Sequence, residues 1–280
     1  MDANQQLGLA ILGLFLVAYL FEWLRGRIQA SRQPGRDALF SLAGITAQSA
    51  LSGPVLGALS GALVVLLFPH AAGGWSHWPF IPAFIGFLLL EDFLHYWLHR
   101  YAHEWRWLWK LHRTHHSGTA MNVGLVFRYN VFWTLLLPQS WIAALLVYMG
   151  LVEVFFAVTF VTFAVNVVTH LSSRWDLWLW ENVPAIRPLW SALARVITTP
   201  DTHHAHHGMG PDSNARGNYA VVFFLWDTLF GTGKIPRRAQ QRIGLPHSGR
   251  LHWAEELFWP LVSKPVAPKS PSFPLERSSQ

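Results

Sequence analysis

Residues 80–117 read FIPAFIGFLLLEDFLHYWLHRYAHEWRWLWKLHRTHHS, an apolar run that ends in two clusters of histidine. Up to Leu98 the only charged residues in the run are Glu91 and Asp92. A helix needs about 20 apolar residues to cross the hydrocarbon core of a bilayer. The stretch therefore predicts a membrane-spanning helix over Phe80–Leu98 that delivers histidines to the membrane surface.

The composition of the whole chain also indicates a membrane protein. Of its 280 residues, 52% are hydrophobic and only 13% are charged, and Trp occurs 16 times. A soluble protein this apolar would have too few polar residues for its surface. Trp is enriched where protein crosses the membrane–water interface.

Four more apolar runs are long enough to suggest spans, which makes about five transmembrane helices. The five runs are Leu7–Leu24, Leu42–Phe68, Phe80–Leu98, Val131–Met149 and Leu151–Val168. The Lys and Arg residues fall only in three blocks between or after these runs, Arg25–Arg36, Arg100–Arg128 and Arg174–Arg277. Basic loops stay in the cytoplasm, so we expect the N-terminus outside and the C-terminal third in the cytoplasm. This charge order also argues against nucleic-acid binding as the reason for the net charge of +6.

The predicted fold is thus an all-α integral membrane protein with a cytoplasmic, histidine-rich helical cap. We divide it into N-terminal transmembrane helices (1–84), a catalytic domain (85–235) and a cytoplasmic tail (236–280). Pro and Ser crowd the last fifteen residues, which predicts disorder there. The chain has no cysteine, so thiolate metal sites and thiol catalysis are excluded.

Three histidine clusters have spacings that suit metal binding. They are His99 and His103 (H-x3-H), His112, His115 and His116 (H-x2-H-H), and His203, His206 and His207 (H-x2-H-H). Residues three and four apart share one face of a helix, so each cluster aims its imidazoles at one place. Imidazole is the commonest metal ligand among side chains. The second copy of the spacing skips His204, which we expect to lie outside the site.

Five further polar residues are candidates around these clusters. His170 ends the fifth apolar run, one helical turn after Asn166, and either side chain could complete a metal site. Polar groups at that depth are costly and usually functional. His95 precedes His99 by one turn, and ligand, hydrogen-bond donor and packing residue are all open to it. Asp92, and with less support Asp227, are expected to accept the free N–H of a metal-bound histidine.

At these residues the sequence resembles the fatty acid hydroxylase superfamily, also called the sterol desaturase family. EDFLHYWLHRYAHEWRWLWKLHRTHHS (91–117) resembles the first two histidine boxes, and TTPDTHHAHHG (198–208) the third. GNYAVVFFLWDTLFGTG (217–233) resembles a downstream segment of the family, and the match covers about residues 85–235. One departure is Ala220, because Gly usually follows the Asn-Tyr pair, and this puts the local turn in doubt.

The resemblance implies two metal ions, normally iron, O2 as co-substrate, and oxidation of a lipid C–H bond. The ligands it implies are His99, His103, His112, His115, His116, His170, His203, His206 and His207. It also implies a separate electron-transfer protein, either a ferredoxin or a cytochrome b5-like protein. Within the family the sequence more closely resembles a bacterial-type, ether-lipid-monooxygenase-like branch, and in a bacterium the membrane would be the cell inner membrane. Zinc binds the same ligands and is expected to compete in purified samples.

Other functions remain open at this stage. The same oxidant could make a desaturase or a C-4 demethylating oxidase. A di-zinc membrane hydrolase and a non-enzymatic metal-binding or transport protein belong to other classes. The second, third and fourth runs are almost purely apolar, which argues against transport. Iron content and lipid-dependent O2 consumption separate the oxygenase from the hydrolase.

Overall fold

The computed structural model describes residues 3–246 and 251–264, and it is helical, as predicted. In that part of the chain the only β-type pairing is an isolated bridge between Gly208 and Ile243. The long helices are α1 (Ala3–Leu24), α2 (Pro34–Ala47), α3 (Gly53–Leu67), α4 (Phe80–Glu104), α5 (Arg106–His116), α6 (Pro138–Tyr148) and α7 (Val152–His170). The shorter ones are α8 (Trp175–Asn182), α9 (Arg187–Leu193), α10 (Pro200–His207), α11 (Leu225–Leu229) and α12 (Trp253–Phe258).

Three helical runs among the described residues are long and apolar enough to cross a membrane. They are Pro34–Leu67, Phe80–Glu104 and Val152–His170, which match the second, third and fifth predicted runs. The protein is therefore an integral membrane protein. The apolar part of α1, Leu9–Leu24, is shorter than these three.

The predicted span over Val131–Met149 is wrong as a continuous helix. Its first part forms the 3-10 turn η3 (Trp133–Leu136), and Pro138 then starts α6, which has only 11 residues. Proline suits the first turn of a helix and cannot continue one that precedes it. At 1.5 Å per residue α6 is about 16 Å long, against about 30 Å of hydrocarbon.

The chain nevertheless returns to the far end of the helices through α6. The backbone N–H of Gly73 donates to Tyr148 O (2.9 Å), and that of Trp75 donates to Met149 O (3.0 Å). These bonds join the end of α6 to the loop between α3 and α4. Helices α4 and α7 both end in histidines that belong to one site, so both run toward the same face of the molecule. Helix α6, which lies between them in the sequence, carries the chain back toward the opposite end.

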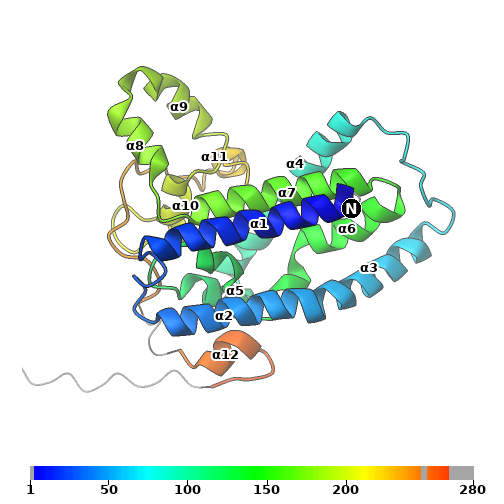
Figure 1. Cartoon of the computed structure of the whole chain (residues 1–280), viewed down its shortest axis with the longest axis horizontal. Coiled ribbons are helices and arrows are strands. Elements are labelled where there is room, and N and C mark those ends of the chain that lie inside the picture. The colour runs from blue at the N-terminus through cyan, green and yellow to red at the C-terminus, as the bar shows by residue number, and fades with distance from the viewer. Residues whose placement is uncertain (1–2, 247–250, 265–280) are drawn as a thin grey trace, which may run out of the picture.

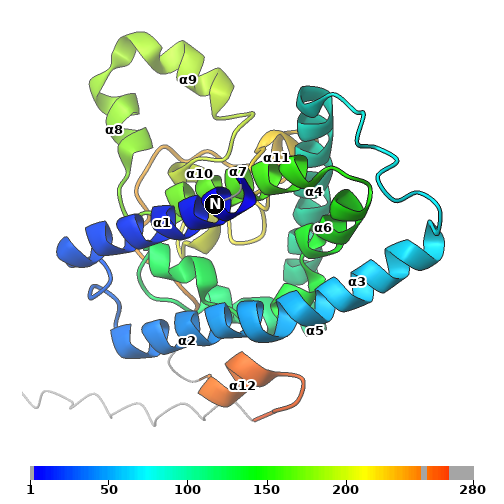
Figure 2. The ribbon, with the colours of Figure 1, turned by 45° about the vertical axis from the view of Figure 1, so that its right-hand side comes forward.

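The helices pack lengthwise around a few shared faces. Helices α1, α7 and the α2–α3 run extend in similar directions in Figure 1, and α1 packs against α7. A π-helical turn, η1 (Gln48–Ser52), joins α2 to α3. One hydrophobic core is made by α4, α6 and α7 and includes Phe87, Leu146 and Val158. Helices α8 and α9 project away from these helices (Figures 1 and 2).

Contacts cross both of the predicted domain boundaries. Helix α12 lies beside α2 in both views (Figures 1 and 2) and contacts α5, so this part of the predicted tail packs on the helices. At the other end of the chain, buried Glu22 accepts hydrogen bonds from the N–H groups of Val123 (2.7 Å) and Ser172 (2.6 Å). The division into 1–84, 85–235 and 236–280 stays a prediction. The disorder predicted for the last fifteen residues falls outside the described residues.

Candidate metal centre

Four helices bring the nine predicted histidines together in two groups. The first group is His99, His103, His112, His116 and His206; the second is His115, His170, His203 and His207. Within each group, one candidate ligand atom from every residue lies within 4.8 Å of those from the others. Eight of the nine residues are buried, and His103 is partly buried. His204 belongs to neither group, as the spacing predicts.

Helices α5 and α10 each serve both groups. On α5, His112 and His116 lie one turn apart and join the first group, while His115 joins the second. Helix α10 reverses the division: His203 and His207 join the second group and His206 the first. The H-x2-H-H spacing therefore places two imidazoles on one side of a helix and one on the other. The groups are adjacent, because the rings of His116 and His207 stack with 4.3 Å between their centroids.

Backbone carbonyls fix the orientation of four of the rings. In each case the ring Nδ1 lies within hydrogen-bond distance of a carbonyl oxygen. The pairs are His99 with Tyr219 O (2.6 Å), His206 with Gly217 O (2.7 Å), His115 with Leu125 O (3.1 Å) and His170 with Asn166 O (2.7 Å). A carbonyl oxygen only accepts, so each Nδ1 carries the proton and each Nε2 is left with a lone pair. This is the usual arrangement of a metal-bound histidine.

The Nε2 atoms of these rings face one another in pairs. His99 and His206 meet at 2.9 Å in the first group, and His115 and His170 meet at 3.3 Å in the second. Two lone pairs at this distance repel unless a cation binds both. Buried His207 supports the same conclusion, because neither of its ring nitrogens has a hydrogen-bond partner. The donor set of each group therefore fits a metal ion.

Burial keeps these imidazoles neutral, which is the form that binds metals. Burial lowers the pKa of His206 to about 4. Burial first, and then the neighbouring His206 and His103, hold the pKa of His116 well below its usual value. Desolvation disfavours the charged imidazolium. At neutral pH both side chains are ready to bind a cation.

The carboxylates near the histidines support the backbone and do not bond to the rings. Asp92, predicted to accept the free N–H of a metal-bound histidine, accepts from no histidine in this structure. Asp92 instead accepts from the N–H groups of Val222 and Phe223 (both 2.8 Å), and Tyr219 O takes the His99 proton. Asp227 likewise bonds to no histidine.

Asp227 acts on His99 indirectly, through the backbone of Tyr219 and Ala220. It is fully buried and accepts from the N–H groups of Tyr219 (2.9 Å) and Ala220 (2.8 Å). Its carboxylate thereby holds the carbonyl that orients His99. The left-handed residue of this turn is Asn218, with φ 56°, so Ala220 causes no conformational conflict. The turn that the departure from the family pattern put in doubt is intact.

His95 and Asn166 line a cavity beside the histidines and do not join either group. The cavity has a volume of about 250 Å³ and is also lined by His99, His115 and His170. His95 Nδ1 lies 3.7 Å from Glu91 Oε1, and Glu91 is buried and accepts from Thr162 Oγ1 at 2.9 Å. Asn166 contributes its backbone carbonyl to His170, and its side chain lines the cavity.

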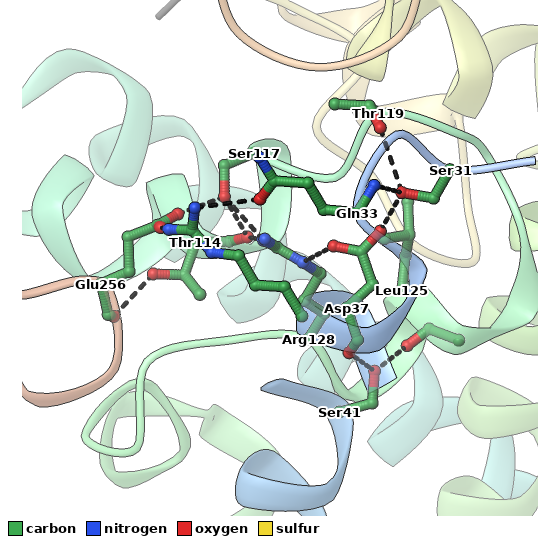
Figure 3. Close-up of polar contacts among 12 residues, drawn as sticks. Ser31, Gln33, Asp37, Ser41, Thr114, Ser117, Thr119, Leu125, Arg128 and Glu256 are labelled. Atoms are coloured by element: carbon green, nitrogen blue, oxygen red, sulfur yellow. Dashed lines mark hydrogen bonds and ion pairs between the residues drawn. The ribbon is translucent and has the colours of Figure 1, made fainter. Parts of the chain in front are cut away.

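A buried network of charged and polar side chains bonds to Thr114 and Ser117, which lie within and next to the second histidine box (Figure 3). Arg128 donates to Asp37 on α2 (2.8 Å), to Ser117 Oγ (2.6 Å) and to the carbonyl of Thr114 on α5. From α12, Glu256 accepts from Ser117. Helix α5, which carries three candidate ligands, is thus tied to α2 and to α12.

Sequence reasoning missed the groups that orient the rings. Tyr219 and Gly217 belong to the segment 217–233 that carries the family resemblance, but they act through backbone oxygens. The side chain of Trp133 packs against His112, with 4.5 Å between the ring centroids. Trp133 lies in the stretch that the sequence predicted to be a membrane span. For Tyr219 and Gly217, the one signal was that the segment 217–233 follows the third histidine box closely in the sequence.

Comparisons with known proteins match the part of the chain that carries the histidine groups. A family model described as fatty acid hydroxylase matches residues 84–232. An alkylglycerol monooxygenase of Xenopus tropicalis is 32% identical over 172 residues, which cover 61% of this chain and 34% of that protein. The human alkylglycerol monooxygenase is 34% identical over 157 residues, with 56% of this chain and 31% of that protein covered.

A methylsterol monooxygenase of Aspergillus fumigatus is 34% identical over 165 residues, covering 56% of this chain and 48% of that protein. The chain spans about a third of the length of the alkylglycerol monooxygenases it matches. No solved structure matches it.

Proposed function

Because the chain belongs to the fatty acid hydroxylase family, we propose that it is a di-iron monooxygenase that hydroxylates a C–H bond of a membrane lipid. The observation that carries this proposal is the two pairs of facing Nε2 atoms beside a lined cavity. The relatives named alkylglycerol monooxygenase and methylsterol monooxygenase support lipid oxidation.

The nine histidines would hold one ion in each group. When bound, iron supplies the strong oxidant from O2 that an unactivated C–H bond requires. The protein orients the rings through carbonyls and excludes water from the buried imidazoles. Zinc fits imidazole ligands but has no redox chemistry, so the family likeness is the reason to prefer iron.

We further propose that the electrons come from a separate ferredoxin or cytochrome b5-like protein. The metal centre and the C-terminus would face the cytoplasm, with the N-terminus outside. In a bacterium the membrane would be the inner membrane. The order of the basic blocks supports this orientation.

The metal proposal is tested one group at a time. Wild type, His206→Ala and His203→Ala are purified with iron and analysed for metal content and for O2 consumption with lipid. We expect two irons in wild type, and a loss of about one or more in each variant together with the activity. His252→Ala, outside both groups, is the control and should keep both ions. Two retained irons with full activity after either change would refute the assignment.

A further inference from the structure

The cavity beside the histidines meets a larger groove. The cavity has a volume of about 250 Å³, and the groove between α3, α6 and α7 has a volume of about 600 Å³. Gln48, Gln139 and Thr159 line both of them. The groove therefore ends where the metal-facing cavity begins.

Glycines keep one wall of this groove open. Gly53, Gly57 and Gly61 line it at intervals of four residues, so they form one stripe along α3. A β-carbon placed on Gly57 or Gly61 would meet no atom within 4 Å. Neither glycine is needed for close packing, and glycine weakens a helix. What the two positions provide is space.

Gln48 marks the junction between the two spaces. It begins the π-helical turn that interrupts the α2–α3 run, and such turns often lie at functional sites. Its side-chain oxygen is buried and has no hydrogen-bond partner. An amide oxygen accepts hydrogen bonds, so it can bond to the O–H of an oxygen-bearing group on a bound molecule.

The groove opens toward the membrane. It lies along a run that is apolar enough to span, and its lining residues Gly57 and Val147 are exposed. An apolar chain already in the bilayer can enter without crossing water, which would disfavour it. The junction at the other end is formed by Gln48 on η1, Gln139 on α6 and Thr159 on α7.

We propose that this groove is the tail channel of the substrate, a lipid with one flexible hydrocarbon chain and an oxygen group near its reactive end. The tail lies along α3, the oxygen group lies at Gln48, and the space beside Gly57 and Gly61 holds the far part of the chain. This inference rests on the proposed function for its substrate class, but occupancy of the channel does not require turnover.

Photo-crosslinking tests occupancy directly. The probe is hexadecan-1-ol with a diazirine at the far end of its chain, added to the purified full chain without O2 or reductant. We expect crosslinks, located by mass spectrometry, on the part of α3 after Gly57 and on the facing residues Ala143 and Ala144 of α6. A diazirine-bearing sterol should crosslink there more weakly.

Three leucine substitutions make the test specific. Gly57→Leu should lower the crosslink yield beyond residue 57 at least about tenfold, comparable to the discrimination of apolar pockets for chain size. Gly61→Leu should do so for hexadecanol but spare a dodecanol probe. Gly13→Leu is the matched control, because a β-carbon there also meets no atom within 4 Å and the residue lines neither space.

Gln48→Leu tests the polar junction separately. It should remove the preference for the alcohol over a matched hydrocarbon diazirine probe while leaving the hydrocarbon yield unchanged. Crosslinks scattered over lipid-facing helices, or yields equal in Gly57→Leu and Gly13→Leu, would overturn the channel. Channel crosslinks in a protein that binds no iron would refute the proposed function and leave the channel standing.

Discussion

At the scale of single residues, Asp227 helps to orient a candidate metal ligand, His99, that it does not touch. Its carboxylate holds the backbone of Tyr219, whose carbonyl orients His99. Asp227→Asn keeps the shape but places an amide N–H against a backbone N–H. We expect a loss of about 1–3 kcal/mol of stability and a fall in iron content, measured by thermal unfolding and metal analysis. Asp212→Asn, a partly exposed carboxylate, is the control and should change neither.

The residue scale also explains what the sequence could reveal about the site. The nine candidate ligands follow from i, i+3 and i+4 spacing, because helical geometry turns spacing into a shared face. The groups that fix the rings could not be predicted in this way. Tyr219, Gly217 and Leu125 act through carbonyls, which every residue has, so no residue type marks them.

At the scale of helices, the same limits apply to α6. An apolar run predicts burial, but it does not distinguish a full span from a short helix preceded by turns. Pro138 is the residue in the sequence that could have indicated where the helix begins, because proline favours the first turn. The turns before α6 place Trp133 against His112, where it lines the cavity beside the histidines.

One buried guanidinium, that of Arg128, joins helix α2 to helix α5. Arg128→Met removes the donor to Asp37, Ser117 and Thr114 and leaves a carboxylate without its partner (Figure 3). Breaking a buried ion pair in this way costs about 3–5 kcal/mol. We expect a lower unfolding temperature in detergent and loss of metal.

Two further variants control this prediction. Arg238→Met removes an exposed, 3.9 Å pair with Asp212 and should cost less than about 1 kcal/mol. Adding Asp37→Asn to Arg128→Met should recover part of the loss, because the unpaired charge is gone. An Arg128→Met protein as stable as wild type would show that the network does not hold α5.

At the scale of the whole molecule, the path of the chain predicts which loops share a side of the membrane. The loop before α4 lies at the far end from the histidines, and residue 238 follows the third box. The absence of cysteine makes labelling unambiguous. His77→Cys should react with an impermeant maleimide on intact cells, and Arg238→Cys only after permeabilisation. Labelling of both in intact cells would contradict the proposed orientation.

The division of α5 and α10 between both groups has a consequence for how the centre assembles. Because each helix supplies candidate ligands to both groups, an ion bound in one group would also order the helices that form the other. A second ion would then meet a site whose ordering cost has already been met, and its affinity would rise. Loading should be cooperative, with few singly loaded molecules at half saturation. The protein would then pass between empty and complete centres, with little of a one-iron form that could react with O2 to no purpose.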